Sequence, residues 1–263
     1  MCERLREGGF RPRAGRWQPP TALLVVGAAL IVTAFYLTEP YWSFRVETSS
    51  RARSVEQRAV ALMAEAMHVI AQAREDAGYP IDAAVDPNRT GLIGVEWSVI
   101  TTTLGDLQAK RTATNPLWAA YVVRRMMDAG VAEGDVVWGT FSGSFPGLNL
   151  AVLAAAEALG VRLYAVSSLS ASTWGANLPQ FTWIDMEAAA RGAGVFTHGS
   201  VALTLGGDDD QGPDLFSMLA GDAEAGVRAL REAARRHPWP LLEPTDLNEE
   251  VAVRLETLRA VSG

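Results

Sequence analysis

Short β-rich runs alternate with Ala-rich helical stretches from residue 91 onward, and this alternation is the main structural signal in the chain. The runs of apolar and β-branched residues predict four strands, at 92–96, 135–141, 162–167 and 200–205. Helical stretches separate these runs, as is typical of parallel strands joined by crossover helices. We therefore predict an α/β domain with an open, mostly parallel sheet and helices on both faces.

Helical periodicity and helix stop signals mark the other elements. In 51–77, apolar residues recur at three- and four-residue spacing with charged residues opposite them, which predicts either a stalk or a first helix that packs on the domain. Asn115 and Pro116 are typical of a helix start, and that helix is expected to end at residue 129. Further helices are expected at 146–159, 213–236 and 246–259.

An apolar run lies close to the N-terminus, at residues 21–37, and its 17 residues include no charged side chain. This length reaches the lower limit for crossing a hydrocarbon core of roughly 30 Å. Tyr36, Tyr41 and Trp42 cluster at its C-terminal end, and such rings prefer the headgroup layer. A cleaved signal peptide and a buried soluble helix are the alternatives, but no clear small-residue cleavage site follows the run. The run therefore predicts an uncleaved transmembrane anchor.

The arginines around this run predict its orientation. Residues 1–20 contain five Arg and two Glu, whereas Arg45, Arg51 and Arg53 follow the run, which favours an inside N-terminus. The expected organisation is a cytoplasmic basic segment, a transmembrane anchor, a juxtamembrane helix and an extracytoplasmic α/β domain, at 1–20, 21–37, 38–80 and 81–263. The protein is thus expected in the cytoplasmic membrane as a single-pass protein.

Composition excludes several classes of protein and site. A net charge of -7 argues against a nucleic-acid partner, which needs clustered Lys and Arg. Cys2 is the only cysteine, so no intramolecular disulfide or thiolate metal cluster can form, and three histidines are few for a zinc site. Gly139, Gly143 and Gly147 do not match the dinucleotide spacing, so no nucleotide cofactor is expected. These observations leave open a site in which oxygen ligands hold a divalent cation.

The turn after the strand at 135–141 is the first candidate site. Ser142, Gly143 and Ser144 precede a predicted helix, where free N–H groups and the helix dipole favour a carboxylate or phosphate. The alternative is that the serines only cap the helix. The turn does not match a G-x-S-x-G nucleophile elbow, and His198 lies before the fourth strand, so a serine–histidine triad is not expected.

Three consecutive acids, Asp208, Asp209 and Asp210, follow the last predicted strand and form the second candidate site. Ligands of open α/β sheets bind at the carboxyl ends of the strands. Adjacent carboxylates suit Mg²⁺ or Ca²⁺, and their crowding favours a raised pKa that could serve proton transfer. A solvated turn is the alternative.

Two further polar loops complete the candidate sites. The first combines hydroxyls with two cations that could hold an anionic ligand, at Thr101, Thr102, Thr103, Lys110 and Arg111. Lys110 is the only lysine in the chain. The second, which runs from Ser167 to Asn177 and includes the candidate Ser170, again places hydroxyls directly after a strand. An ordinary strand or loop is the alternative for the threonine run.

Four stretches, taken in order, resemble the poly-gamma-glutamate system proteins: 91–116 (GLIGVEWSVITTTLGDLQAKRTATNP), 142–146 (SGSFP), 170–177 (SASTWGAN) and 205–208 (LGGD). These are bacterial membrane-anchored proteins associated with making or exporting poly-gamma-glutamate. The resemblance covers about residues 91–212 and implies a process without assigning catalytic residues. It also implies a C-terminus that is shortened after Leu258.

Two functional hypotheses follow. In the first, the chain is a membrane-anchored accessory protein of poly-gamma-glutamate biosynthesis or export that binds a glutamyl ligand at the strand ends, with the polymer or its synthetase and export proteins as partners. In the second, it is an anchored hydrolase or transferase acting on gamma-glutamyl or related amide bonds. That enzyme would use Asp208 to Asp210 with a metal or water, and an oxyanion site at Ser142 and Ser144.

Overall fold

The computed structural model describes residues 21–42, 50–212 and 223–263. The chain divides into two compact units, Met1–Glu47 and Thr48–Gly263. The predicted basic segment 1–20 lies outside the described residues, as do residues 213–222 of the helix expected at 213–236. The boundary between the two units falls inside the predicted juxtamembrane segment 38–80.

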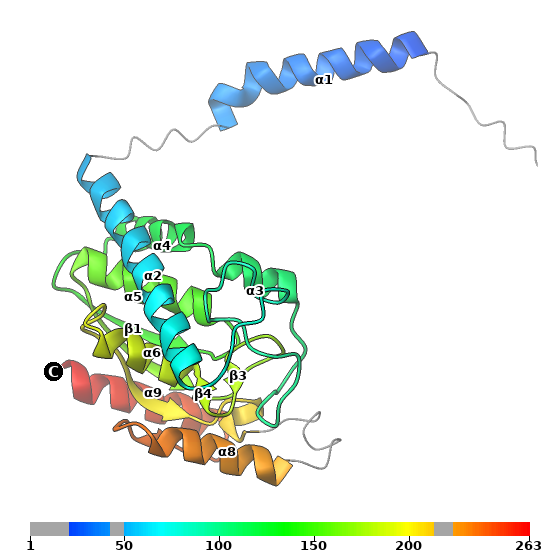
Figure 1. The fold of residues 1–263 in the computed structure, drawn as a ribbon. Helices are drawn as coiled ribbons and strands as arrows, with labels where there is room; N and C mark the ends of the chain where they lie inside the picture. The colour runs from blue at the N-terminus through cyan, green and yellow to red at the C-terminus, as the bar shows by residue number, and fades with distance from the viewer. Residues whose placement is uncertain (1–20, 43–49, 213–222) are drawn as a thin grey trace, which may run out of the picture. The chain divides into compact units, whose positions relative to one another are not determined.

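The second unit is built around a four-stranded parallel sheet (Figure 1). Its strands are β1 (Val136–Phe141), β2 (Arg162–Ser168), β5 (Gly199–Thr204) and β6 (Leu241–Leu242), in the order β1-β2-β5-β6. All three neighbouring pairs are parallel. The predicted parallel sheet is therefore confirmed, and its first three strands agree with the predicted ones to within about one residue.

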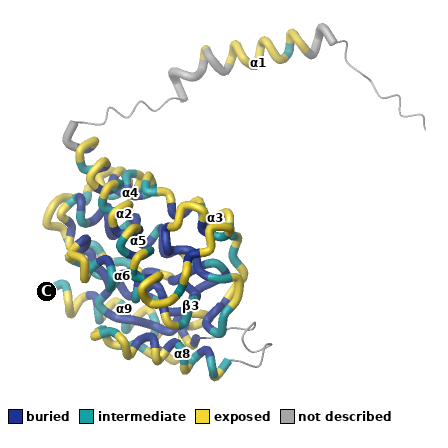
Figure 2. The backbone as a smooth tube through the Cα atoms, viewed as in Figure 1, coloured by how far each residue is buried: buried dark blue, intermediate teal, exposed yellow. Residues whose placement is uncertain are grey.

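Helices cover both faces of this sheet, as the alternation of side chains along β2 shows. Leu163 and Ala165 belong to a core shared with α2 (Ser50–Asp76), α4 (Leu117–Asp128), α5 (Pro146–Leu159) and α6 (Trp183–Gly192). Val166 points to the opposite face and packs with Leu258 of α9 (Leu247–Ser262). Leu230 of helix α8 (Ala223–Arg235) packs with Leu203 of β5 and Ile184 of α6. The sheet and α5 are among the most buried parts in Figure 2.

Helix α2 belongs to the folded unit and is not a detached stalk. Its fully buried residues Ala59, Met63, Ala66 and Ile70 recur every three or four positions, so they form one apolar stripe along the helix. That stripe packs in the same core as α4, α5 and α6. Of the two alternatives for this segment, the structure therefore confirms a first helix that packs on the domain.

Helix α1 (Thr21–Trp42) covers the apolar run that predicts a membrane anchor. In the part of the chain that the structure describes, no helix combines the length and the apolarity needed to cross a bilayer. The anchor at 21–37 therefore stays a prediction.

Several elements differ from the sequence prediction. Residues 92–96 do not form a strand, because their backbone bonds to a loop: Trp174 donates its N–H to the Val95 carbonyl at 2.9 Å. The polar stretch before residue 114 contains a helix, α3 (Leu107–Ala113), whose N-cap Asp106 accepts from the Ala109 N–H. Helix α6 and the short hairpin of β3 (Asn177–Leu178) and β4 (Phe181–Thr182) were not predicted.

Candidate functional site

The loops that follow β1, β2 and β5 meet at the carboxyl edge of the parallel sheet. The backbone N–H of Ala176 donates to the Gly143 carbonyl at 2.8 Å, and that of Ser170 donates to the Leu205 carbonyl at 3.0 Å. A Cβ on Gly143 would lie 2.6 Å from the Ser170 carbonyl oxygen, so only glycine permits this approach. The loops that follow these three parallel strands therefore lie against one another at one edge of the sheet.

Asn177 is fully buried and holds the loop before α3 in place. Its Nδ2 donates to Thr101 Oγ1 at 2.9 Å and to the Val95 carbonyl at 2.8 Å, while its Oδ1 accepts from the Val95 N–H at 2.9 Å. Thr102 is also buried, and its N–H donates to the Ala171 carbonyl, whereas Thr103 is exposed. Asn177 and Thr101, which were predicted to bind a ligand, thus bind each other and organise the loops.

Ser142 and Ser144 are also engaged by their own surroundings. Ser142 Oγ accepts from the Ser144 N–H at 3.2 Å, and Ser144 Oγ accepts from the Ser172 N–H at 3.0 Å. The N-cap of α5 is Phe145, which makes no side-chain capping bond. These serines therefore shape the loops, and neither caps the helix as the alternative prediction proposed.

Lys110 lies at the junction of these loops and is buried, with only 3% of its surface exposed. Its Nζ donates to the Ser144 carbonyl at 2.6 Å and to Ser172 Oγ at 2.8 Å, and lies 3.6 Å from the centre of the Phe145 ring. Burial lowers the pKa of Lys110 to about 8. Among the ion pairs of the described residues, none offers this ammonium a carboxylate.

The three acids after β5 do not assemble a cation site. Asp208 and Asp209 are exposed, whereas Asp210 is buried, accepts from Thr204 Oγ1 at 3.0 Å and pairs with Arg254 of α9. Across residues 21–42, 50–212 and 223–263, no group of three or more His, Cys, Asp or Glu is arranged to hold a metal ion. Asp210 thus links the loop after β5 to α9, and its oxygens bind neither predicted serine.

Arg111 follows Lys110 in α3 but points elsewhere, because successive residues of a helix differ in direction by about 100°. Its Nε donates to the Val85 carbonyl at 2.9 Å and its Nη2 donates to the Ala84 carbonyl at 2.5 Å. The two cations therefore have separate sets of hydrogen-bond partners. Lys110 faces the loops at the strand ends, and Arg111 faces a cavity on the other side of α3.

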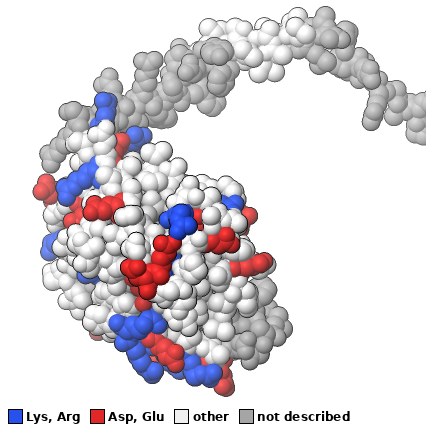
Figure 3. All heavy atoms as spheres, in the orientation of Figure 1, with Lys and Arg blue, Asp and Glu red and all other residues white. Residues whose placement is uncertain are grey.

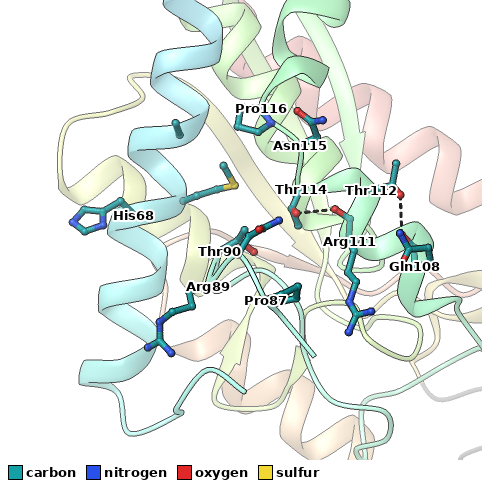
Figure 4. Close-up of a pocket in the computed structure, with 13 residues that line it drawn as sticks. His68, Pro87, Arg89, Thr90, Gln108, Arg111, Thr112, Thr114, Asn115 and Pro116 are labelled. Carbon is teal, nitrogen blue, oxygen red and sulfur yellow. Dashed lines mark hydrogen bonds between the residues drawn. The ribbon is translucent and has the colours of Figure 1, made fainter. Parts of the chain in front are cut away.

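That cavity, called the Arg111 pocket here, has a volume of about 810 Å³. It lies between α2, the turn at 87–90, α3 and the start of α4, and it is lined by Ala64, Met67, His68, Pro87, Asn88, Arg89, Thr90, Gln108, Arg111, Thr112, Thr114, Asn115 and Pro116. Figure 4 shows Arg89 and Arg111 on its two sides, with His68 pointing away from its centre. The volume falls in the range of small-molecule sites.

The positive charge at the Arg111 pocket comes from the residues that line it and not from the surrounding surface. No Asp or Glu is among the described residues that line it, and Arg89 forms an ion pair with Glu75 outside the lining. The face of the molecule seen in Figure 3 carries both signs of charge side by side. An anion would therefore be held by the groups in the pocket, since this face is not uniformly basic.

Arg89 was not singled out from the sequence as a site residue, and neither was Ser172. Arg89 lies in a turn with a positive φ of 49°, and Ser172 is one of several hydroxyls in its loop. Arg89 belongs to no motif with a known spacing, whereas Ser172 lies within the hydroxyl-rich stretch 170–177 that carries part of the resemblance. Comparison of the chain with protein-family models, with curated proteins and with solved structures found no match.

Proposed function

We propose that this chain is a membrane-anchored accessory protein of poly-gamma-glutamate biosynthesis or export, and that its α/β domain binds the anionic glutamyl ligand in the Arg111 pocket. The observation that carries this proposal is a cavity of about 810 Å³ that two guanidinium groups flank and whose described lining contains no carboxylate. The motif resemblance supports the choice of ligand. The loops at the strand ends are a poorer fit, because their polar groups already bind one another.

The chemistry of the pocket suits a chain of carboxylates joined by amide bonds. A guanidinium group binds a carboxylate through two parallel hydrogen bonds, and such bonds are stronger than those between neutral groups. Arg111 is already oriented by the carbonyls of Val85 and Ala84, so less conformational freedom is lost when the ligand binds. The side chains of Gln108, Asn115 and Thr112 provide donors and acceptors for the amide groups of a polymer.

The net charge of -7 opposes a polyanion at long range. Screening limits this effect, because the Debye length is about 8 Å at physiological ionic strength. Local guanidinium groups therefore dominate once the ligand is in contact with the pocket. Binding should weaken as salt rises, since the exposed part of this attraction is screened.

The proposal is tested with the purified full-length chain in detergent and a short oligomer of gamma-linked glutamate, with binding measured by calorimetry. Arg111→Met should weaken binding about tenfold or more, because hydrogen bonds to charged groups contribute about 1.5–3 kcal/mol. Arg125→Met is the matched control, since Arg125 is exposed and pairs only with Asp128 of the same helix among the described residues. Unchanged binding by Arg111→Met with loss in Lys110→Met would move the site to the strand ends. Full binding by both variants would refute the proposal.

The anchor at 21–37, with its N-terminus inside, is part of the same proposal. Its support is the uncharged run and the five arginines that precede it. Protease treatment of intact cells should digest the α/β domain and spare a tag placed at the N-terminus. Protection of the domain, or its recovery in the soluble fraction, would contradict the proposed topology. A pull-down with the synthetase and export proteins tests the proposed partners.

A further inference from the structure

A buried lysine and a buried serine lie in contact at the carboxyl edge of the sheet, outside the Arg111 pocket. Lys110 Nζ and Ser172 Oγ are 2.8 Å apart, and 3% and 4% of the two residues are exposed. We propose that Ser172 and Lys110 form the nucleophile and general base of an acyl-transfer site that acts on ester or amide carbonyls. This site is independent of the Arg111 pocket and of its ligand.

The surroundings of Lys110 orient its amine for this role. In the neutral amine, one N–H donates to the Ser144 carbonyl at 2.6 Å, which leaves the lone pair free to accept the Ser172 hydroxyl proton. A serine hydroxyl becomes a strong nucleophile only when an adjacent base removes its proton. Lysine acts as that base in serine–lysine pairs.

An amine base must be neutral to accept a proton, and the surroundings of Lys110 disfavour its charged form. Burial is the cause that lowers the pKa of Lys110 to about 8, so about a tenth of the molecules carry a neutral amine at pH 7. Asp106 and Arg111 are the charged neighbours on its own element. The groups that face its ammonium from other elements are Ser144, Phe145 and Ser172, which are uncharged. A carboxylate in contact would instead stabilise the ammonium form and remove the base.

A short segment covers the pair. A Cβ placed on Gly105 would lie 3.0 Å from Ser172 Oγ and 3.0 Å from Lys110 Cε, so the Gly105 backbone lies directly against both side chains. Leu104, which precedes Gly105 in this segment, is 72% exposed. Thr173 holds the segment, because its Oγ1 accepts from the Gly105 N–H at 2.5 Å and its N–H donates to the Thr103 carbonyl. Displacing residues 103–106 would open the pair to a substrate.

The reaction balances with water as the second reactant. Ser172 Oγ bonds to the carbonyl carbon while its proton moves to neutral Lys110 Nζ. The bond from that carbon to the leaving amine or alcohol then breaks, and Nζ returns the proton to the leaving group. Water next attacks the acyl-serine ester with Lys110 again taking a proton, which releases the acid and restores the serine hydroxyl.

The test treats the full-length chain with a fluorophosphonate probe between pH 7 and pH 10 and identifies the labelled peptide by mass spectrometry. The expected result is label on Ser172, at a rate that rises with pH and levels off above about pH 8. Lys110→Met should slow labelling about 100-fold or more, the usual contribution of a general base. Ser262→Ala is the matched control, because the Ser262 hydroxyl lies at the end of α9 and donates to the Arg259 carbonyl of the same helix, and this variant should label normally at Ser172.

Three outcomes would overturn the proposal: no label on Ser172 across this range, a labelling rate with no inflection between pH 7 and pH 9, or full labelling of folded Lys110→Met. The first two are measured on the wild-type protein, so they decide the matter even where a variant fails to fold. Arg111→Met should keep the labelling of Ser172, and Ser172→Ala should keep the binding of glutamate oligomers. A negative result for one of the two proposed sites therefore leaves the proposal for the other site testable.

Discussion

Replacing Lys110 by Met should remove the part of the pH dependence of stability that comes from the buried amine. The folded protein holds the pKa of Lys110 at about 8, while the unfolded chain returns it to about 10.5. The unfolded state therefore binds more protons between these values, and the stability of the wild-type protein rises with pH across this window. Met has a similar length and no charge, so the variant lacks this contribution.

The size of the effect follows from the two pKa values. Each pH unit between them corresponds to about 1.4 kcal/mol, so the penalty for the buried ammonium is about 3 kcal/mol below pH 8. It disappears above pH 10.5, where both states are neutral. Between pH 7 and pH 10 the wild-type protein should therefore gain about 2 to 3 kcal/mol relative to Lys110→Met.

Urea unfolding at fixed ionic strength measures this difference, followed by circular dichroism at pH 7, 8, 9 and 10. Titration of other groups cancels when the two proteins are compared at each pH. Arg111→Met is the control, because arginine keeps its charge throughout this range. A difference between wild type and Lys110→Met that stays constant within about 0.5 kcal/mol would refute the reasoning and would mean that water reaches the ammonium group in the folded state.

Three further predictions concern the buried polar groups. Asp210→Leu should lower the free energy of unfolding by about 1.5–3 kcal/mol, because Arg254 and Thr204 lose a charged hydrogen-bond partner while Arg254 keeps its ion pair with Glu250; unchanged thermal unfolding would contradict this. Glu187 is fully buried, and burial raises its pKa, so wild-type stability relative to Glu187→Gln should fall as pH rises above 4.5; urea unfolding from pH 4 to pH 8 checks the sign. Asn177→Ala should cost about 2 to 4 kcal/mol, since Thr101 and Val95 lose buried hydrogen-bond partners, and hydrogen exchange should quicken at residues 95–101 if the loop is released.

Much of the fold could be predicted because it rests on local patterns. The helix at 146–159 was placed correctly, since it begins with Pro146 and ends at Gly160, which adopts the left-handed conformation. The strand expected at 92–96 does not form, and the reason is a contact with a distant part of the chain. A Cβ on Gly94 would lie 2.1 Å from the Gly175 carbonyl oxygen, so this extended segment packs against a loop 80 residues away instead of joining the sheet.

The candidate site shows the same division between local and distant causes. The order of strands and turns was sufficient to predict that the loops after β1, β2 and β5 share one edge, because parallel strands place their carboxyl ends together. Nothing in the order of residues indicates that Lys110 meets Ser172, or that Arg111 turns toward Ala84 and Val85. Those partners depend on the rotation of α3 about its axis, which is set by the distant segments that pack around it. Residue types and their spacing thus determined the sheet and its polar edge, whereas packing between distant segments decided which cation lies in the buried cluster and which lines the open pocket.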